Sequence, residues 1–221
     1  MGDMEQIKLK HSTLKLVDKI LAEALLSDVA IYMSLIDAVK AVCASYKNGG
    51  RTFICGNGGS ASDSEHIVGE LVKSFKKKRP IDKAFTEKFL ENFPSDGELI
   101  KKTETGFPAF SLVSQTAIMT AINNDIGGDY VFSQQAYAYV GANDAFIGIS
   151  TSGNSVPVCN AAKISKVKGA KIISFTGKGG GELKNIGDIN IVSTKTETYR
   201  VQQDHIVLYH ALCAAVEEEL I

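Results

Sequence analysis

The chain has 221 residues, a length that suits one α/β domain with an extra element or two. Apolar residues make up 44% and charged residues 22%, as in soluble globular proteins. The formal net charge is −1, so no overall basic field favours a nucleic-acid partner. Four scattered cysteines without a CxxC pair favour a reducing cytoplasm over a disulfide framework.

We expect neither a signal peptide nor a membrane-spanning segment in this sequence. Residues 1–5 are polar and acidic, unlike the start of a signal peptide. No apolar run looks long enough to span a bilayer, so we expect no membrane partner and a cytoplasmic protein. The one basic cluster, at residues 76–79, is interpreted as a solvated helix end whose charges suit the helix dipole.

Apolar residues recur at helical spacing from about residue 11 to 47 and predict two helices, with Ser27 and Asp28 as a cap between them. Partly β-branched runs then predict five strands, at residues 52–55, 109–113, 145–149, 171–175 and 189–192. Because helical or loop stretches separate these strands, we expect a three-layer α/β/α sandwich with a central parallel sheet. A last helix is expected over about residues 198–220, ending in a solvated acidic run at 217–219.

Residues 81–107 interrupt the alternation of strands and helices. This stretch is charged, and its large apolar side chains lie at roughly helical spacing before a turn at residues 94–97. We expect a short helix, the turn and a second short helix, inserted into a single domain that spans residues 1–221. Insertions of this size are often lids or oligomer contacts, and the sequence leaves both open.

Two loops have the chemistry of anion sites. The first predicted strand stops in Gly56-Asn57-Gly58-Gly59-Ser60, directly before a helical pattern. Glycines let the backbone approach a ligand, and the free N–H groups of a first helical turn point at it. A second loop of this kind, Ser150-Thr151-Ser152-Gly153-Asn154-Ser155, follows the third strand. Either loop alone would suit an ordinary turn, but the pair predicts a phosphorylated ligand between them, at the carboxyl ends of the strands.

Ionisable residues follow the first loop. His66 and Glu70 are four residues apart, so they share one helix face. Gln202 and His210, eight apart, can share a face of the last helix, whereas His205 should point elsewhere. If the two helices meet, the cluster suits either proton transfer by a carboxylate and an imidazole or a divalent metal, with the Gln202 amide as a weaker ligand.

Taken together, these motifs resemble those of the sugar isomerase (SIS) domain family, and within it the phosphoheptose (sedoheptulose 7-phosphate) isomerases. The resemblance is carried by the segment GNGGSASD at residues 56–63, His66 and Glu70, STSGNS at 150–155, RVQxxH at 200–205, and His210. It covers nearly the whole chain. It implies a flavodoxin-like sheet, a homotetramer with active sites between subunits, and conversion of sedoheptulose 7-phosphate to D-glycero-D-manno-heptose 7-phosphate through a cis-enediol, for bacterial surface heptoses.

The resemblance also implies roles for individual residues. Glu70 would be the base and His210 the partner acid or base. In some members zinc is held by residues matching His66, Glu70, Gln202 and His210. The substrate-binding set, phosphate and sugar together, would be Asn57, Gly58, Gly59, Ser60, Asp125, Ser150, Thr151, Ser152, Ser155 and Gln202.

The chain departs from the family pattern in two places. The segment at 81–107 is longer than usual, and Tyr199 stands where some members have an acidic residue near the ligand. Two alternatives therefore stay beside the heptose isomerase. One is a non-catalytic SIS-fold regulator of replication initiation, a branch that lacks the histidine matching His210. The other is an isomerase or a sensor of another phosphosugar.

Overall fold

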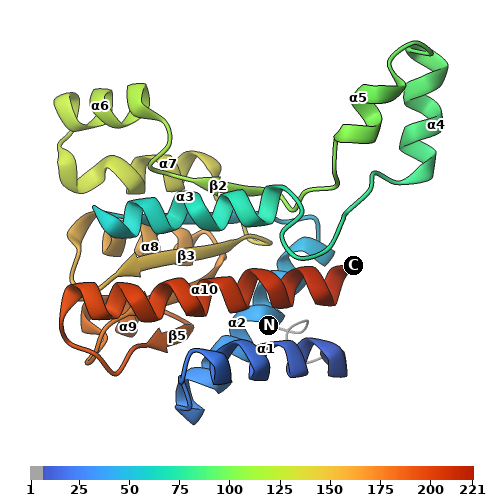
Figure 1. The fold of residues 1–221 in the computed structure, drawn as a ribbon. Coiled ribbons are helices and arrows are strands. Elements are labelled where there is room, and N and C mark those ends of the chain that lie inside the picture. Colours follow the sequence, from blue (N-terminus) through green and yellow to red (C-terminus); the bar gives the residue numbers. More distant parts are fainter. Residues whose placement is uncertain (1–6) are drawn as a thin grey trace.

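In the computed structural model, which describes residues 7–221, a parallel sheet with the strand order β2-β1-β3-β4-β5 forms the centre (Figure 1). The acidic segment at residues 1–5 lies outside the described residues. All four strand pairings are parallel. Each strand falls on a run expected from the sequence, although β2 is two residues shorter than the expected 109–113. The strands are β1 (Thr52–Gly56), β2 (Ala109–Ser111), β3 (Ala145–Ser150), β4 (Lys171–Thr176) and β5 (Ile189–Val192).

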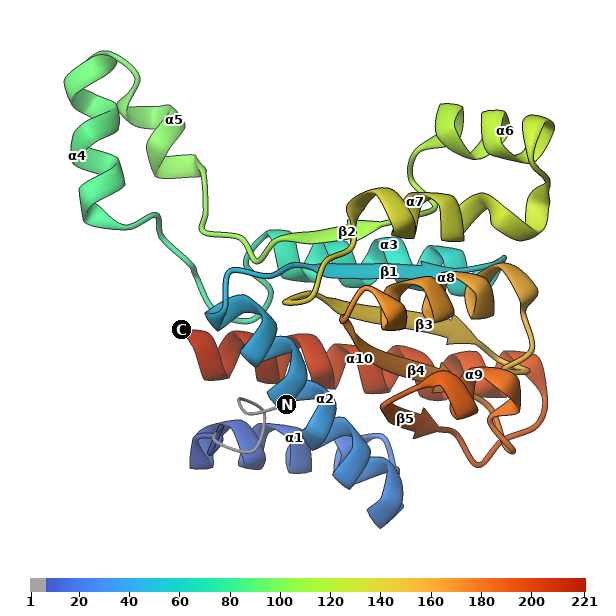
Figure 2. The ribbon, with the colours of Figure 1, turned by 180° about the vertical axis from the view of Figure 1, so that it is seen from behind.

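Helices cover both faces of the sheet, which confirms the three-layer sandwich (Figures 1 and 2). Two helices at the start of the chain and one at its end are where the periodicity places them. The helices are α1 (His11–Glu23), α2 (Val29–Lys47), α3 (Gly59–Val72), α4 (Lys83–Asn92), α5 (Gly97–Lys102), α6 (Thr116–Asp125), α7 (Val131–Tyr139), α8 (Val156–Val167), α9 (Gly181–Ile186) and α10 (Thr198–Leu220).

Side chains that point alternately to the two faces of the sheet form two hydrophobic cores. In β1, Ile54 packs with the side chains of α1, α2, α3 and α10, whereas Phe53 and Cys55 pack on the other face with those of α6, α7, α8 and α9. Successive side chains of a strand point to opposite faces, so a strand buried on both sides is apolar throughout. The Asp28 carboxylate accepts a hydrogen bond from the Ile31 N–H and caps α2, as expected.

Helix α2 corrects the expectation that no apolar run could span a bilayer. By length and composition alone this helix is long and apolar enough to do so, with a mean hydropathy of 1.4 over its most apolar stretch. However, 56% of that stretch is buried inside the fold, where α2 contacts β5 and α10. A core helix of a globular domain passes the same test of length and hydropathy, and α2 has the packing of such a helix.

The expected insertion forms two short helices, α4 and α5, which extend away from the sheet (Figures 1 and 2). Helix α4 has no buried side chain, and Phe85 and Phe93 in this region are more than half exposed. The base of the insertion is closed by an antiparallel bridge between Pro80 and Glu104. The insertion is therefore anchored at its base, while its helices pack little on the rest of the chain.

Two charged runs differ from their expected solvated state. Glu217 is 2% exposed, and its carboxylate accepts the backbone N–H groups of Phe75, Lys76 and Lys77. Arg79, the last residue of the basic run, is 1% exposed and pairs with Glu217. The reason is tertiary: residues some 140 positions apart in the sequence neutralise each other in a buried pair, which no local pattern reveals. Glu219 is also buried, where it accepts hydrogen bonds from the Lys10 N–H and the Thr13 hydroxyl.

Candidate active site

The two anion-type loops lie side by side in the fold. The first follows β1 and the second follows β3, and these strands are neighbours at the centre of the sheet. The chain leaves β1 towards β2 on one side and leaves β3 towards β4 on the other, so the loops flank the point where the strand order reverses. Ligands of open α/β sheets bind in this crevice. The Asn57 amide donates to the Ser155 hydroxyl at 2.8 Å and joins the two loops directly.

Glycine is required at specific points of these loops. Gly58, which precedes the first residue of α3, has φ +58°, and Gly153 has φ +69°. A Cβ at Gly153 would also lie 1.9 Å from the Gly180 carbonyl oxygen. Among residues 7–221, no side chain caps the N-terminus of α3 or of α8. In α3 the Ser60 and Ala61 N–H groups donate to the carbonyls of Asn57 and Gly58. The positive end of each helix dipole is therefore what favours an anion at these N-termini.

The hydroxyl side chains of the loops differ in burial. Ser60 and Ser150 are nearly buried, at 3% and 5% exposed. Ser152 is exposed, and its hydroxyl accepts the Asn154 N–H at 3.1 Å. Thr151 and Ser155 are half-buried beside them. These hydroxyls, which can donate and accept, lie on the two joined loops with Asn57 and the glycines, a set of groups that suits a phosphate.

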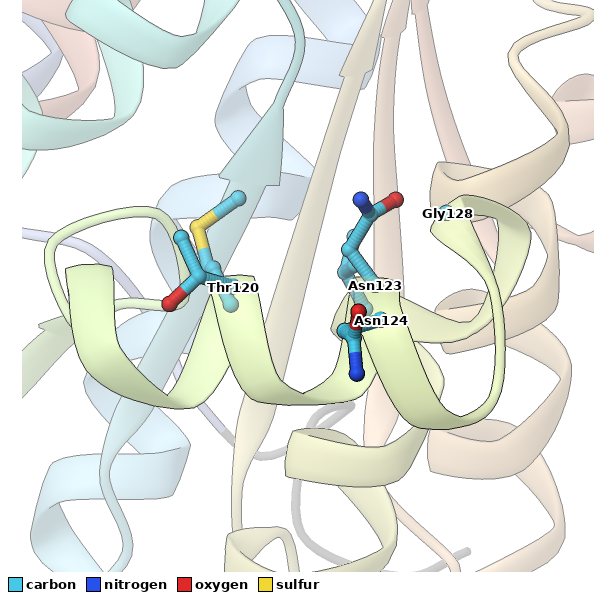
Figure 3. A pocket seen from close by; sticks show the side chains of 6 residues that line it. Thr120, Asn123, Asn124 and Gly128 are labelled. Atoms are coloured by element: carbon cyan, nitrogen blue, oxygen red, sulfur yellow. The ribbon is translucent and has the colours of Figure 1, made fainter.

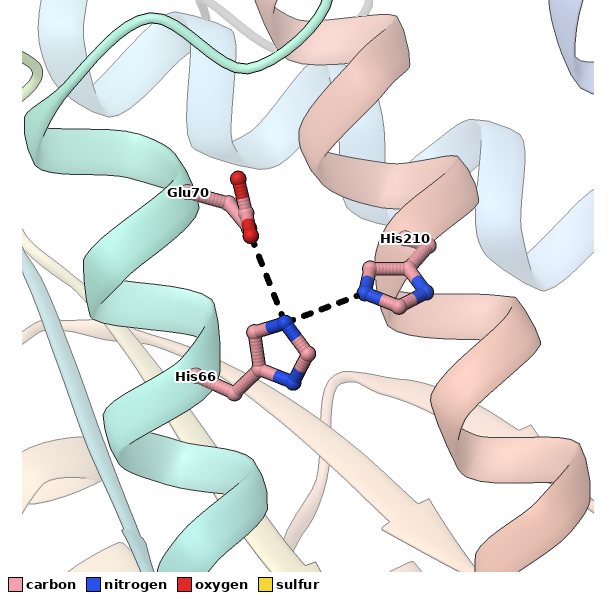
Figure 4. A group of neighbouring side chains, drawn as sticks. All are labelled: His66, Glu70 and His210. Carbon is pink, nitrogen blue, oxygen red and sulfur yellow. Dashed lines mark hydrogen bonds and ion pairs between the residues drawn. The ribbon is translucent and has the colours of Figure 1, made fainter.

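His66, Glu70 and His210 come together where α3 crosses α10 (Figure 4). His66 Nε2 lies 3.3 Å from Glu70 Oε1 and 3.3 Å from His210 Nε2. One ligand atom from each residue lies within 4.8 Å of the other two. The structure thus brings together three of the four residues that the sequence assigned to a common cluster.

Neighbouring side chains orient this cluster. Phe75 stacks on the His210 ring with centroids 5.7 Å apart, and Lys73 Nζ lies 3.4 Å from Glu70 Oε2. Burial, helped by the nearby His66, lowers the pKa of His210, while the Glu70 carboxylate opposes the shift. The neutral imidazole of His210 is therefore the favoured form near neutral pH. A neutral imidazole can accept a proton from a substrate or bind a metal.

The donor set fits a zinc ion. Two imidazoles and one carboxylate are typical ligands of catalytic zinc, which keeps a further position for substrate or water. Two ligands of a tetrahedral zinc, each about 2.0–2.1 Å from the metal, lie about 3.3 Å apart. That spacing matches the distances from His66 Nε2 to Glu70 Oε1 and to His210 Nε2.

Gln202 lies on α10 eight residues before His210, near the start of the helix. Its amide packs on the first loop, because a Cβ at Gly59 would lie 2.2 Å from Gln202 Nε2. Gln202 and His210 both face α3, as predicted, but they are two turns apart, about 12 Å along the axis. His205 points elsewhere, also as predicted: it is fully buried and its Nε2 lies 3.3 Å from the Thr176 carbonyl oxygen.

Asp125 ends α6 and is exposed, and its carboxylate accepts the Asn124 amide at 2.8 Å. No hydrogen bond among the described residues joins Asp125 to Asn57, which donates to Ser155 instead. Beside it, a hollow of about 620 Å³ is lined by α6 and the segment that follows, with Thr120, Asn123 and Asn124 among its polar side chains (Figure 3).

The sequence reasoning missed Asp63 and Tyr209. The Tyr209 hydroxyl lies 3.0 Å from His66 Nδ1, and burial, the Asp63 charge and a hydrogen bond with Asp63 raise the pKa of Tyr209. Burial raises the pKa of Asp63, and the contacts with Tyr209 and His66 oppose this shift. One signal was available, because Asp63 is three residues before His66 and shares its helix face. Tyr209 gave none, since it depends on how α10 meets α3.

Comparison with known proteins agrees with this geometry. Family models described as the SIS domain match residues 112–217 and residues 21–90. A phosphoheptose isomerase from Aliarcobacter butzleri is 37% identical over 183 residues, 83% of this chain and 84% of that protein. One from Aneurinibacillus thermoaerophilus is 36% identical over 198 residues, 90% of this chain and 87% of that protein. The structure of a phosphoheptose isomerase from Neisseria gonorrhoeae matches with a TM-score of 0.68 and 29% identity, and covers 94% of both chains.

The fold and the site thus define a protein of the SIS-domain class. Within that class, the chain belongs to the phosphoheptose isomerase family.

Proposed function

We propose that this chain is an aldose–ketose isomerase that converts sedoheptulose 7-phosphate to D-glycero-D-manno-heptose 7-phosphate, the entry to bacterial surface heptoses. The observation that carries the proposal is the cluster of Glu70, His66 and His210. Two of its members, His66 and Glu70, lie on the helix that opens at the first phosphate-type loop. His66 follows Ser60 by six residues, about 9 Å along α3, which leaves room for a sugar between phosphate and cluster. Sugar phosphate isomerisation needs both a fixed phosphate and a proton-transfer pair.

The reaction is a proton transfer between neighbouring carbons. In our proposal, Glu70 removes a proton from C1 of the open-chain ketose, and a cis-enediol forms. The same carboxyl group then returns the proton to C2, and His210 gives and takes the hydroxyl proton. A proton next to a carbonyl is weakly acidic, so a positioned base must act together with stabilisation of the developing oxyanion.

The loops supply binding energy far from the reacting carbons. Ser60, Ser150, Thr151, Ser152 and Ser155 are proposed to hold the phosphate with the backbone of Gly58 and Gly59. Asn57, Asp125 and Gln202 are proposed to contact the sugar. Binding energy from a remote phosphate can orient C1 and C2 against Glu70, which lowers the entropic part of the barrier.

Zinc is proposed as the cofactor, held by His66, Glu70 and His210, with Gln202 as a fourth ligand. The distances in the cluster support the first three ligands. Gln202 would have to turn from the Gly59 backbone to join them. When bound, zinc would polarise the substrate oxygens and stabilise the enediolate charge.

We further propose a cytoplasmic homotetramer in which one SIS domain spans residues 1–221. The four cysteines are buried free thiols, which supports a reducing compartment. Leu25, between α1 and α2, and Val29, the first residue of α2, are 89% and 74% exposed, and the α4–α5 insertion has exposed aromatic side chains. Large exposed apolar residues of this kind are common at subunit contacts. The insertion at 81–107 would be such a contact or a lid.

The test is a direct assay on a panel of phosphosugars, with Glu70→Gln as the matched inactive variant. The proposal is supported if the wild type converts sedoheptulose 7-phosphate and converts no pentose or hexose phosphate with a similar kcat/KM. If another phosphosugar is converted faster, the protein is an isomerase with a different substrate. Binding without turnover of any sugar would identify a regulator or a sensor.

A further inference from the structure

A polar chain lies behind the cluster, on the side of His66 that faces the protein interior. Asp63 is 7% exposed and Tyr209 is 1% exposed. The Tyr209 hydroxyl lies 3.0 Å from His66 Nδ1. The Asp63 carboxyl is near enough for its charge to raise the pKa of Tyr209. Asp63 and His66 come from α3, and Tyr209 from α10, so the chain exists only where the two helices meet.

The three side chains of this polar chain, Asp63, Tyr209 and His66, have fewer protons than acceptor atoms. A tyrosine hydroxyl has one proton at neutral pH, and here it has two possible acceptors, the Asp63 carboxylate and His66 Nδ1. Asp63 Oδ2 is shielded from solvent, and no described residue makes a hydrogen bond to it in good geometry. A buried carboxylate is the stronger acceptor and is costly to leave without a donor, so the hydroxyl proton belongs to Asp63. The oxygen of Tyr209 can then only accept, so it favours the His66 tautomer with the proton on Nδ1, against the competing acceptor Glu70 Oε1, 3.3 Å from Nε2.

We propose that Asp63 and Tyr209 are positioning residues that hold the proton of His66 on Nδ1 and leave Nε2 free of a proton, facing Glu70 and His210. The inference deepens the proposed function, because it assigns a cause to the metal-binding form of the cluster. A neutral imidazole has one N–H, and the partner of one ring nitrogen decides which nitrogen has it.

The opposite tautomer would give a different cluster. With its proton on Nε2, His66 would donate to Glu70 Oε1, 3.3 Å away, and the three residues would form an ordinary hydrogen-bonded group. With Nε2 free, lone pairs of His66, Glu70 and His210 converge, and a cation stabilises such a set. Asp63 and Tyr209 thus adapt the cluster to a cation such as zinc.

The tautomer is measured directly in the full chain with ¹⁵N-labelled histidine, by long-range ¹H–¹⁵N correlation without metal. The sequence has four histidines, and a His66→Gln sample assigns the signal of His66. We expect one tautomer in the wild type, with the proton on Nδ1. In Tyr209→Phe, which keeps the ring, we expect a mixture of tautomers. In Asp63→Asn the side-chain amide can donate to Tyr209, so the hydroxyl proton turns to His66 and the proton of His66 moves to Nε2.

Tyr46→Phe is the matched control, because it removes another buried hydroxyl, one that accepts from Thr52 Oγ1 at 2.8 Å. It should leave the His66 signal unchanged. Zinc affinity, measured by competition with a chelating dye, should fall about 10–100-fold in Tyr209→Phe and not in Tyr46→Phe.

Two results would overturn the inference: a wild-type His66 with its proton on Nε2, or a His66 tautomer that is the same in Tyr209→Phe and Asp63→Asn as in the wild type. The tautomer is read without substrate or metal, so it decides the inference even if sedoheptulose 7-phosphate is not turned over. A failure of turnover with the expected tautomers would count against the proposed substrate alone.

Discussion

The buried pair of Glu217 and Arg79 offers a sharp test of how the site is supported. In Glu217→Gln, one negative charge is lost while the side chain keeps its shape. The Arg79 guanidinium donates to the carbonyls of Leu71 and Glu70 at 2.8 and 2.9 Å, and its Nε lies 3.1 Å from Glu217 Oε1 without the alignment of a hydrogen bond. The variant therefore leaves a buried positive charge without its counter-charge.

The expected cost follows from this burial. Removing one partner of a buried ion pair typically costs about 3–5 kcal/mol, because the remaining charge is not compensated. The amide of the variant also keeps a single oxygen for the three backbone N–H groups of Phe75, Lys76 and Lys77. Since domains are stable by about 5–15 kcal/mol, the loss is a large fraction of the total.

The assay is urea unfolding at a fixed protein concentration, because an oligomer would couple stability to concentration. With an m-value of about 3 kcal/mol per M, the midpoint should fall by about 1–1.7 M. Glu218→Gln is the matched control, since Glu218 pairs with Lys77 nearer the surface and should cost less than about 1 kcal/mol. Equal effects of the two substitutions would refute the reasoning.

The remaining predictions concern the site and its surroundings. Glu70→Gln should lower kcat by about 10²–10⁴ with KM changed only a few-fold, and a near-normal rate in steady-state assays would remove Glu70 as the base. His210→Asn should lose turnover yet still bind sedoheptulose 7-phosphate in calorimetry; unchanged activity would exclude His210 from the mechanism. Chelation should lower activity and added zinc restore it, whereas activity in protein that elemental analysis finds metal-free contradicts a zinc enzyme. Burial lowers the pKa of His205 from 6.5 to about 4. As the pH falls, the unfolded chain therefore binds a proton at His205 before the folded chain does. The free energy of unfolding should be fully present above pH 6.5 and fall by about 3 kcal/mol as the pH drops to 4. In His205→Gln this part of the pH dependence should disappear, and equal slopes in both proteins would show that His205 is not its source.

The order of elements could be predicted from the sequence because its signals are local. Apolar runs such as the one at β3 and glycines such as Gly58 mark where strands end and helices begin. The cluster of His66, Glu70 and His210 was foreseeable for a related reason. Spacings of four and eight residues fix helix faces, so one assumption, that α3 meets α10, was enough.

What could not be predicted depends on contacts between distant segments. Glu217 and Arg79 were expected in solvent because charged runs at helix ends usually are solvated, and their pairing depends on the turn after α3 reaching the end of α10. Tyr209 was missed for the same reason: beside His210 in the sequence, it is a core aromatic residue by pattern, and only the crossing of α3 and α10 places its hydroxyl on His66. Helix α2 was misjudged in the other direction, because hydropathy does not distinguish a core helix from a membrane span.

The central claim is that the chain isomerises sedoheptulose 7-phosphate through an enediol formed at Glu70. The most direct measurement is incubation of the purified protein with this sugar in deuterated water, followed by NMR. The account predicts an aldose anomeric signal and deuterium at C2 of the product, because the proton held by a carboxylate base can exchange with solvent before it returns. Absence of both product and exchange, in protein that still binds the phosphosugar, would contradict the account.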